Sequence, residues 1–347
     1  MNKAFYSLAL TAALTFSVGL SAQTVKSQTV ENGGTGPYKA VVVGDESLPA
    51  FTVYRPQDMG SAGKLPVILY ANGGCANATT EMRFLLNELA SYGYIAVGIG
   101  PYEEDDPNEK WAGALKTMGV TAKKMILSNG QEVKPLSAEE RQKFEEQMRK
   151  EIEEAMKQQN KAKAPAPSER PFQTYPGQLL EAMDWLTAQN ADPKSEYYHK
   201  IDLDKVVAMG QSCGGAQVLA VAHDPRIKTC VILNSGIGDM VMQGATQENL
   251  KNLHTPMLYL IGGPEDVAFP NAAKDYERIK ELPVVMINTI DGHCGTYYEK
   301  NGGAYAVVVH KWLDWQLKGK VGQSGIFLDD DCFRAVYPEW TEVRKNW

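Results

Sequence analysis

The feature that most constrains the fold is a short segment in which an apolar run meets a cluster of small residues. Residues 206–209 read Val-Val-Ala-Met, which is typical of a buried strand, and small residues of helical character follow at 214–222. Between them lies the sequence G-Q-S-C-G at 210–214. A strand that turns directly into a helix crowds its own backbone, and glycine tolerates both the close approach and the strained dihedral angles. We therefore predict a tight bend that raises the Ser212 hydroxyl above the sheet.

The pattern G-x-S-x-G at such a bend is the arrangement with which serine hydrolases expose a nucleophile. A serine hydroxyl reacts slowly at neutral pH unless a base lies within hydrogen-bonding reach. The alternative interpretation is a glycine-rich turn with a solvated serine, because a pattern of five residues also occurs by chance. The strand before the pattern and the helix after it favour Ser212 as a nucleophile.

Apolar runs and amphipathic segments alternate along most of the chain. We expect strands at 38–43, 50–55, 65–70, 94–99, 205–209, 229–233, 257–261 and 284–288, and helices at 80–91, 177–188, 214–222, 271–280 and 305–317. This alternation predicts an α/β fold, a mostly parallel central sheet with helices on both faces. Ligands of such sheets bind at the carboxyl ends of the strands.

Residues 103–170 interrupt the alternation. The segment opens with an acidic run, continues into a long polar helix with one narrow apolar stripe between 144 and 156, and ends near two prolines. We interpret it as a helical insertion laid on the core. Two roles stay open for it, a lid over the functional site and a surface helix that packs by one face.

The N-terminal residues 1–22 have the pattern of an export signal. Lys3 precedes an apolar stretch, and the small residues at 21–22 resemble a cleavage site. A membrane anchor is the alternative, but the apolar run is short and no charged stop follows it. We expect an exported protein, periplasmic or secreted and without a membrane anchor, whose residues 23–347 form a single domain.

Charge and cysteine content limit the classes of partner. The formal net charge is −7 and no long basic run is present, which argues against nucleic acid as a partner. Export permits disulfides, but five cysteines (75, 213, 230, 294 and 332) leave at least one thiol unpaired. Pairing among Cys75, Cys213 and Cys294, or of Cys294 with Cys332, stays open. No C-x-x-C spacing points to a metal, and we expect no metal or organic cofactor.

One of the five histidines has the position of a catalytic base. In an α/β sheet with this bend, the partners follow in the order Ser, acid, His, each just past the end of a strand. His293 follows the expected strand at 284–288 through a turn at 291–295. His199 precedes the nucleophile, and the other three lie in or beside helices or before a strand. We therefore predict His293 as the base.

The acid is expected between Ser212 and His293 in the chain. Asp266 follows the strand at 257–261 through a Gly-Gly-Pro-Glu turn, and we select it, with Glu265 and Asp239 as alternatives. A purely structural role for Asp266 is to cap the following helix. The acid of such a triad orients the histidine and stabilises its cationic form.

Two backbone amides are expected to bind the oxyanion that develops during acyl transfer. One is the amide of Cys213, at the N-terminus of the helix that follows the nucleophile. The other is the amide of Gly74, in the loop after the strand at 65–70, with that of Cys75 as its replacement. A simple Gly-Gly turn at 73–74 is the structural alternative.

Together these segments resemble the α/β-hydrolase superfamily, and more narrowly its cutinase-like, polyester-hydrolase and dienelactone-hydrolase-related branch. The resemblance covers most of residues 37–320 apart from the insertion, and it is carried by Asn72-Gly73-Gly74-Cys75, Ala90-Ser91-Tyr92-Gly93-Tyr94, the bend at 210–214, Asp266 with Pro270, and Asp291-Gly292-His293. It implies a serine esterase that works through an acyl-enzyme on a small-molecule or carbohydrate-linked ester. Position 74, often aromatic in that branch, and the insertion are where this chain differs from it.

Two other functions use the same features. A peptidase or amidase would need the same nucleophile, base and acid. A non-catalytic binding protein on this fold usually lacks part of that set, whereas all three residue types are present here.

Overall fold

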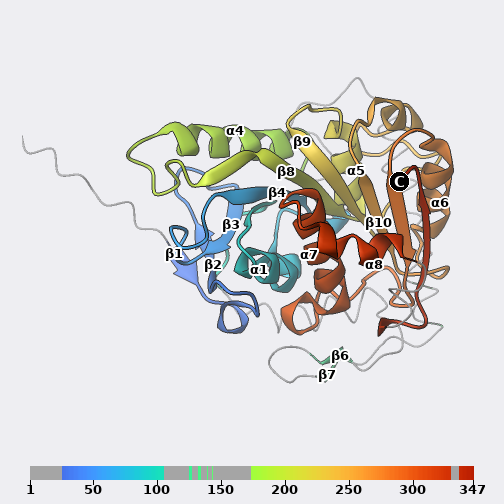
Figure 1. Cartoon of the computed structure of the whole chain (residues 1–347), viewed down its shortest axis with the longest axis horizontal. Coiled ribbons are helices and arrows are strands. Elements are labelled where there is room, and N and C mark those ends of the chain that lie inside the picture. Colours follow the sequence, from blue (N-terminus) through green and yellow to red (C-terminus); the bar gives the residue numbers. More distant parts are fainter. Residues whose placement is uncertain are drawn as a thin grey trace, which may run out of the picture.

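A ten-stranded, mostly parallel sheet organises the part of the chain that the structure describes (Figure 1). The structure is a computed structural model, and it describes residues 26–104, 125–126, 132–133, 139, 143, 173–329 and 336–347. The expected export signal at 1–22, nearly all of the insertion at 103–170 with its helix, and Cys332 lie outside these residues. The α/β class predicted from the sequence is therefore confirmed for the described residues.

The sheet has a parallel centre and antiparallel edges. Its spatial order is β1-β2-β3-β5-β4-β8-β9-β10-β11-β12, and the strands from β5 to β11 in that order run parallel. Pairing is antiparallel at β1–β2, β2–β3, β3–β5 and β11–β12. The strands are β1 (Lys26–Gln28), β2 (Ala40–Gly44), β3 (Phe51–Pro56), β4 (Leu65–Ala71), β5 (Ile95–Ile99), β8 (Ile201–Gln211), β9 (Ile227–Leu233), β10 (Met257–Ile261), β11 (Val284–Asn288) and β12 (Thr341–Lys345).

Helices cover both faces of the sheet. The α-helices are α1 (Arg83–Ser91), α4 (Gly177–Ala191), α5 (Cys213–Val221), α6 (Phe269–Arg278), α7 (Gly303–Gln316) and α8 (Gly325–Leu328). Side chains of α1 and α7 pack on one face, and those of α4, α5 and α6 pack on the other. Short 3₁₀ turns lie in the connections between elements: η1 (Glu31–Gly33), η2 (Gly73–Cys75), η3 (Thr80–Met82), η5 (Gln247–Asn252), η6 (Lys300–Gly302) and η7 (Val321–Gln323).

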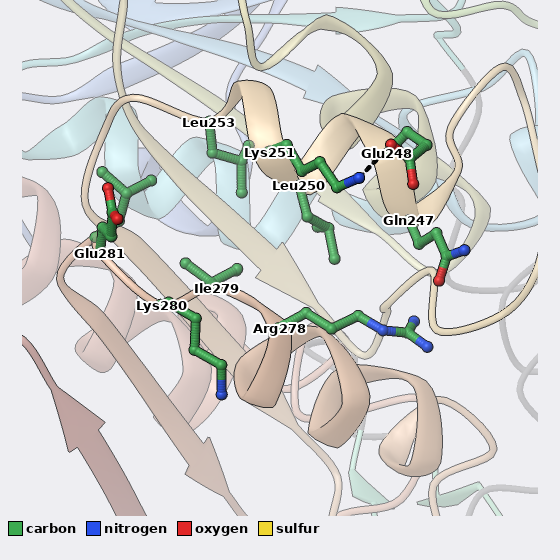
Figure 2. Close-up of a pocket in the computed structure, with 10 residues that line it drawn as sticks. Gln247, Glu248, Leu250, Lys251, Leu253, Arg278, Ile279, Lys280 and Glu281 are labelled. Carbon is green, nitrogen blue, oxygen red and sulfur yellow. Dashed lines mark hydrogen bonds and ion pairs between the residues drawn. The ribbon is translucent and has the colours of Figure 1, made fainter.

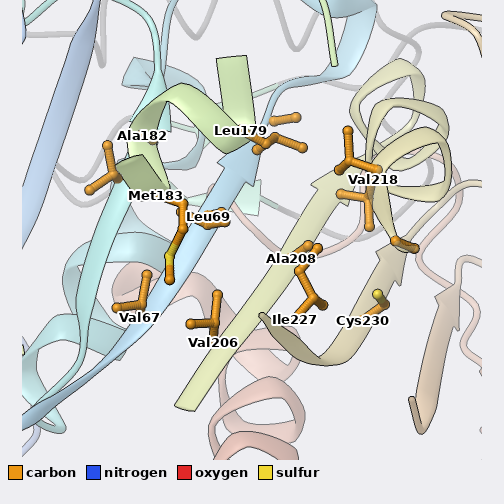
Figure 3. Close-up of a cluster of buried hydrophobic side chains, with 14 of the residues drawn as sticks. Val67, Leu69, Leu179, Ala182, Met183, Val206, Ala208, Val218, Ile227 and Cys230 are labelled. Atoms are coloured by element: carbon orange, nitrogen blue, oxygen red, sulfur yellow. The ribbon is translucent and has the colours of Figure 1, made fainter. Parts of the chain in front are cut away.

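Alternation of side chains along the buried strands produces two separate cores. In β4, Val67 and Leu69 point to the α4 and α5 side (Figure 3), whereas Ile68 and Tyr70 point to the α1 and α7 side. A strand covered on both faces has no solvated side, so both sets of residues are apolar. This double burial explains why the central strands read as continuous apolar runs.

Every strand expected from the sequence is present, but three features differ. The expected strand at 205–209 is the second half of β8, which starts at Ile201 in a charged stretch and pairs with β4 through a register shift. Two strands of the sheet were not predicted, β1 in a polar segment before the first expected strand and β12 near the C-terminus. β1 and β12 lie at the edges of the ten-stranded sheet, where a strand has one neighbour and needs no apolar run. Helix ends differ from the predicted ends by at most three residues.

Few residues of the insertion are described. They include two short antiparallel strands, β6 (Met125–Ile126) and β7 (Glu132–Val133), and an exposed ion pair between Glu139 and Lys143. The choice between a lid and a surface helix thus falls outside the described residues. Within the described ranges, no helix combines the length and apolar character needed to cross a bilayer.

Candidate active site

Ser212 lies at a bend between the end of β8 and the start of α5. Its φ of 51° and ψ of −119° place it in a region that residues with a side chain rarely occupy. The Ser212 amide donates a hydrogen bond to the Leu233 carbonyl over 2.9 Å, and its carbonyl accepts one from the Ser235 hydroxyl over 2.6 Å. These bonds hold the strained residue on both sides of its α-carbon.

Two glycines make this bend sterically possible. A Cβ atom added at Gly214 would lie 2.1 Å from the Ala71 carbonyl oxygen, and one added at Gly210 would lie 2.3 Å from the Gly214 carbonyl oxygen. Neither position has room for a side chain. The first and last residues of the G-x-S-x-G pattern are therefore required by the close approach of β4, β8 and α5.

Ser212, His293 and Asp266 form one continuous chain of hydrogen bonds. The distance from Ser212 Oγ to His293 Nε2 is 2.9 Å, and that from His293 Nδ1 to Asp266 Oδ1 is 2.7 Å. Because a carboxylate only accepts, Nδ1 carries the proton and Nε2 is left to accept the proton of the serine hydroxyl. The His293 side chain is 20 % exposed, so a bound molecule can reach it. The structure thus brings together the three residues predicted from the sequence.

The Asp266 carboxylate is buried and fully surrounded by donors. Besides His293, it accepts hydrogen bonds from the amides of Gly262 and Ala268, each over 2.9 Å, and from Asn234 Nδ2 over 2.8 Å. Burial raises the pKa of Asp266, but the hydrogen bonds and the nearby imidazole outweigh burial and leave the pKa below its ordinary value. The residue is therefore ionised at neutral pH and stabilises positive charge on His293.

The two alternative acids lie elsewhere. Asp239 accepts hydrogen bonds from Lys274 and Arg278, which lower its pKa to about 2, and its side chain is exposed. Glu265 is exposed beside the turn that carries Asp266. Of the three candidates, Asp266 is the residue that is hydrogen-bonded to His293.

Asn234, which was not among the predicted site residues, connects Asp266 to the loop that carries His293. Its side-chain amide donates to Asp266 Oδ2 and, over 2.9 Å, to the Gly292 carbonyl, while its Oδ1 accepts from the Tyr297 hydroxyl. The residue is completely buried and has a φ of 44°. An asparagine directly after a predicted strand was the available signal, because asparagine tolerates left-handed backbone.

Further hydrogen bonds join the loop of His293 to its neighbours. The side chain of Gln211, the residue before the nucleophile, donates to the His293 carbonyl over 3.1 Å. The amide of Gly292 donates to the carbonyl of Gly262 over 2.9 Å, which connects the histidine loop to the loop that carries Asp266. The position of the imidazole is therefore set from two directions.

On the other side of Ser212, the loop after β4 is joined to α5 by a disulfide between Cys75 and Cys213, whose Cα atoms are 5.2 Å apart. This pairing is one of those that the sequence left open. Cys230 and Cys294 are buried, and burial raises the pKa of each thiol to about 12, so both stay protonated at neutral pH. Neither is a competing thiolate beside Ser212.

A groove lies near the amino ends of β10 and β11, whereas Ser212, His293 and Asp266 follow the carboxyl ends of their strands. It measures about 550 Å³ and is lined by η5, the end of α6 and the segment leading into β11 (Figure 2). Lys251 and Glu248 form an ion pair on its wall. None of its lining residues belongs to the hydrogen-bonded chain of Ser212, His293 and Asp266.

In the ranges that the structure describes, no three His, Cys, Asp or Glu residues are grouped to hold a metal ion.

No model of a known protein family matches the chain, and no curated protein matches its sequence.

Proposed function

We propose that this protein is a serine esterase with an α/β-hydrolase fold, which cleaves carboxylic esters through an acyl-enzyme. The observation that carries the proposal is the hydrogen-bonded chain of Ser212, His293 and Asp266, with the serine on a strained bend. The three residues follow β8, β11 and β10, so all of them lie at the carboxyl ends of parallel strands. This is where ligands bind in such sheets.

In the first half-reaction, Ser212 Oγ attacks the carbonyl carbon of the ester while His293 Nε2 takes the hydroxyl proton. The carbonyl π bond opens and leaves a tetrahedral intermediate with a negative oxygen. When this intermediate collapses, the bond to the alkoxy oxygen breaks and His293 returns the proton to the leaving alcohol. The acyl group remains as an ester on Ser212.

In the second half-reaction, water takes the place of the alcohol. His293 Nε2 removes a proton from the water as its oxygen attacks the acyl carbon, and a second tetrahedral intermediate forms. Collapse breaks the bond to Ser212 Oγ, which regains its proton from His293. The products are the free acid and the unchanged enzyme. Asp266 keeps the proton of the neutral imidazole on Nδ1 throughout.

The negative oxygen of each intermediate would lie between two backbone amides. The amide of Cys213 is at the first position of α5, where helix amides lack intrahelical acceptors and the helix dipole favours negative charge. The amides of Gly74 and Cys75, in the loop joined to Cys213, are the candidates for the second donor. One such donor lowers the barrier by about 3–4 kcal/mol.

Turnover of p-nitrophenyl acetate by the wild type and by Ser212→Ala tests the proposal. We expect the variant to lose at least about 10³-fold in kcat, because it has no nucleophile. Ser61→Ala, which removes an exposed serine in a turn between β3 and β4, is the matched control and should keep full activity. A fluorophosphonate probe should label the wild type and not Ser212→Ala.

Equal ester turnover by the wild type and Ser212→Ala would end the esterase proposal. Turnover of p-nitroacetanilide as fast as that of the ester would instead assign the protein to the amidases. A folded wild type that turns over neither compound and takes no probe would favour a non-catalytic binding role.

We propose further that the protein acts outside the cytoplasm. The export pattern at 1–22 and the disulfide between Cys75 and Cys213 support this location, because disulfides persist in oxidising compartments. The N-terminal residue of protein recovered from the medium or the periplasm tests this. Protein that stays in the cytoplasm with residues 1–22 attached would contradict it.

A further inference from the structure

The residue Cys75 is attached to α5 at two points. Its sulfur is bonded to Cys213, the first residue of the helix. Its carbonyl oxygen accepts a hydrogen bond from the Thr174 hydroxyl over 3.0 Å, and that hydroxyl accepts one from Gln217 Nε2 over 3.0 Å. Gln217 lies one helical turn beyond Cys213. The loop after β4 is therefore held against the first two turns of α5, close to Ser212.

This loop has a backbone conformation that needs support. Gly74 has a φ of 59° and Cys75 a φ of 48°, so two successive residues lie in the left-handed region. Glycine adopts that region freely, but a residue with a Cβ atom does so at a cost and only where its surroundings hold it. Cys75 is buried, and its two attachments to α5 supply that restraint.

The position of Gly74 depends on the residues beside it in the chain. It is exposed, and a Cβ atom at this position would meet no atom within 4 Å, so no packing holds it from its own side. The next residue is the crosslinked Cys75. The disulfide holds the Cα atoms of Cys75 and Cys213 5.2 Å apart, so it restrains the amides of residues 74 and 75 relative to the amide of Cys213.

We propose, on the premise of the esterase function above, that Cys75 and Cys213 are positioning residues of the reaction. Their disulfide fixes the separation between the loop amides and the Cys213 amide, so that both point at the same oxyanion. The oxidised chain is the active form. The dithiol form keeps Ser212, His293 and Asp266 but loses much of its stabilisation of the transition state.

The first test is the double variant Cys75→Ala/Cys213→Ala, assayed per active site titrated with a fluorophosphonate. We expect kcat for p-nitrophenyl acetate to fall about 10- to 100-fold with KM changed less than about threefold, because the donors act mainly on the transition state. The affinity for phenylboronic acid should fall by the same factor as kcat/KM, since its tetrahedral adduct places an oxygen at the oxyanion position.

A merely structural disulfide gives a different result. The variant would then yield less folded protein, but each titrated site would turn over at the wild-type rate, and this outcome overturns the proposal. Cys230→Ala is the matched control, because it also removes a buried sulfur, on β9 and away from the loop. It should keep the wild-type kcat and boronic acid affinity.

A second measurement uses the wild-type chain, in case the double variant does not fold. Dithiothreitol gives two electrons and two protons to the disulfide, which becomes two thiols while the reagent becomes a cyclic disulfide. Activity should fall in step with the appearance of the Cys75 and Cys213 thiols in alkylation mass spectrometry, and oxidised glutathione should restore it. Reduced protein with full activity would contradict the proposal.

If the disulfide can be reduced only by unfolding, and the double variant also stays unfolded, the crosslink serves folding and the proposal is wrong. These outcomes are separable from failure of the esterase function. If the esterase function itself fails, the oxidised wild type will turn over no ester. A defect confined to the reduced or crosslink-free protein bears on the disulfide alone.

Discussion

The loops that carry Asp266 and His293 reach Ser212 from one side of β8, and the loop at 73–75 reaches it from the other side. The two sides are held in place by different kinds of bond. Asp266 and His293 are held by directional hydrogen bonds, several of them from buried polar side chains such as Asn234. The loop at 73–75 is held by a covalent bond and by the hydrogen bond from Thr174 to the Cys75 carbonyl, and both restrain its left-handed backbone. Proton transfer needs side chains of defined chemistry, whereas binding an oxyanion needs only amides in the right place.

This difference separates two ways of damaging the site. On the acid and histidine side, exchanging one polar atom for another changes which nitrogen carries a proton. On the loop side, the amides are present in every variant, and only their positions can change. On the side of Asp266 and His293, we therefore expect the largest losses of activity from substitutions that change a polar atom. On the side of the loop at 73–75, we expect them from loss of the bonds that restrain the loop.

The largest effect is expected for Asp266→Asn. An amide at this position no longer holds the proton of His293 on Nδ1, so the imidazole presents the wrong nitrogen to Ser212. We expect kcat to fall about 10⁴-fold. The measurement is ester turnover over a range of substrate concentrations. Asp239→Asn is the control and should keep most of the activity; the opposite pattern would move the acid to Asp239.

The next effect concerns stability. The Cys75–Cys213 disulfide closes a loop with a sequence separation of 138 residues. Its removal in Cys75→Ala/Cys213→Ala should lower the free energy of unfolding by about 2–5 kcal/mol, chiefly because the unfolded chain gains freedom. Urea unfolding followed by circular dichroism measures this. An unchanged midpoint with an unchanged slope would show that the crosslink leaves stability unaffected.

Asn234→Ala should lower the free energy of unfolding by about 2 kcal/mol, which is less than the effect expected for removal of the disulfide. The reason is that buried polar groups of Asp266, Gly292 and Tyr297 lose this hydrogen-bond partner. Loss of a donor to the ionised carboxylate also raises the pKa of Asp266. The lowered pKa of Asp266 adds stability at pH values above the unfolded-state pKa, and this stability is lost as the pH falls through the folded-state pKa. Because the folded-state pKa is higher in the variant, the variant should unfold at a higher pH in an acid titration. Tyr297→Phe should show a smaller shift in the same direction, and an acid midpoint equal to that of the wild type would remove Asn234 from this role.

The smallest effect concerns Glu81, whose pKa is shifted in the opposite direction to that of Asp266. Burial raises the pKa of Glu81, in η3 beyond the loop at 73–75, to about 7, whereas the pKa of Asp266 is lowered. A raised carboxyl pKa makes stability fall as pH rises from about 4.5 to about 7, because the unfolded chain releases the proton first. Glu81→Gln should remove about 1–2 kcal/mol of this pH dependence, measured by unfolding at pH 4.5 and pH 8. An unaltered slope would show that Glu81 does not cause it.

The parts of the structure that the sequence predicted are those in which one local requirement dominates. The central strands are buried on both faces and so read as apolar runs, and the bend at Ser212 needs glycine at 210 and 214. The order Ser, acid, His selected His293 and Asp266 because each follows a strand. These inferences needed no knowledge of distant contacts.

The parts that were missed depend on contacts between distant residues. β12 is polar and exists because β11 offers it an open edge, and the charged start of β8 pairs with β4 through a register shift. Asn234 acquires its role from Asp266 and Gly292, which are far from it in sequence. The pairing of Cys75 with Cys213 depends on the distance between the loop after β4 and the start of α5, which no spacing along the chain reveals.

The bond between Cys75 and Cys213 also turns 139 residues, 75 to 213, into a closed covalent ring that contains the entire insertion at 103–170. A protease that cuts one peptide bond inside this ring opens it without releasing a fragment. The nicked enzyme therefore migrates as one species until a reductant is added and then as two. The chain could be lengthened or cleaved within 103–170 while the disulfide keeps the segments before and after this region joined beside the nucleophile.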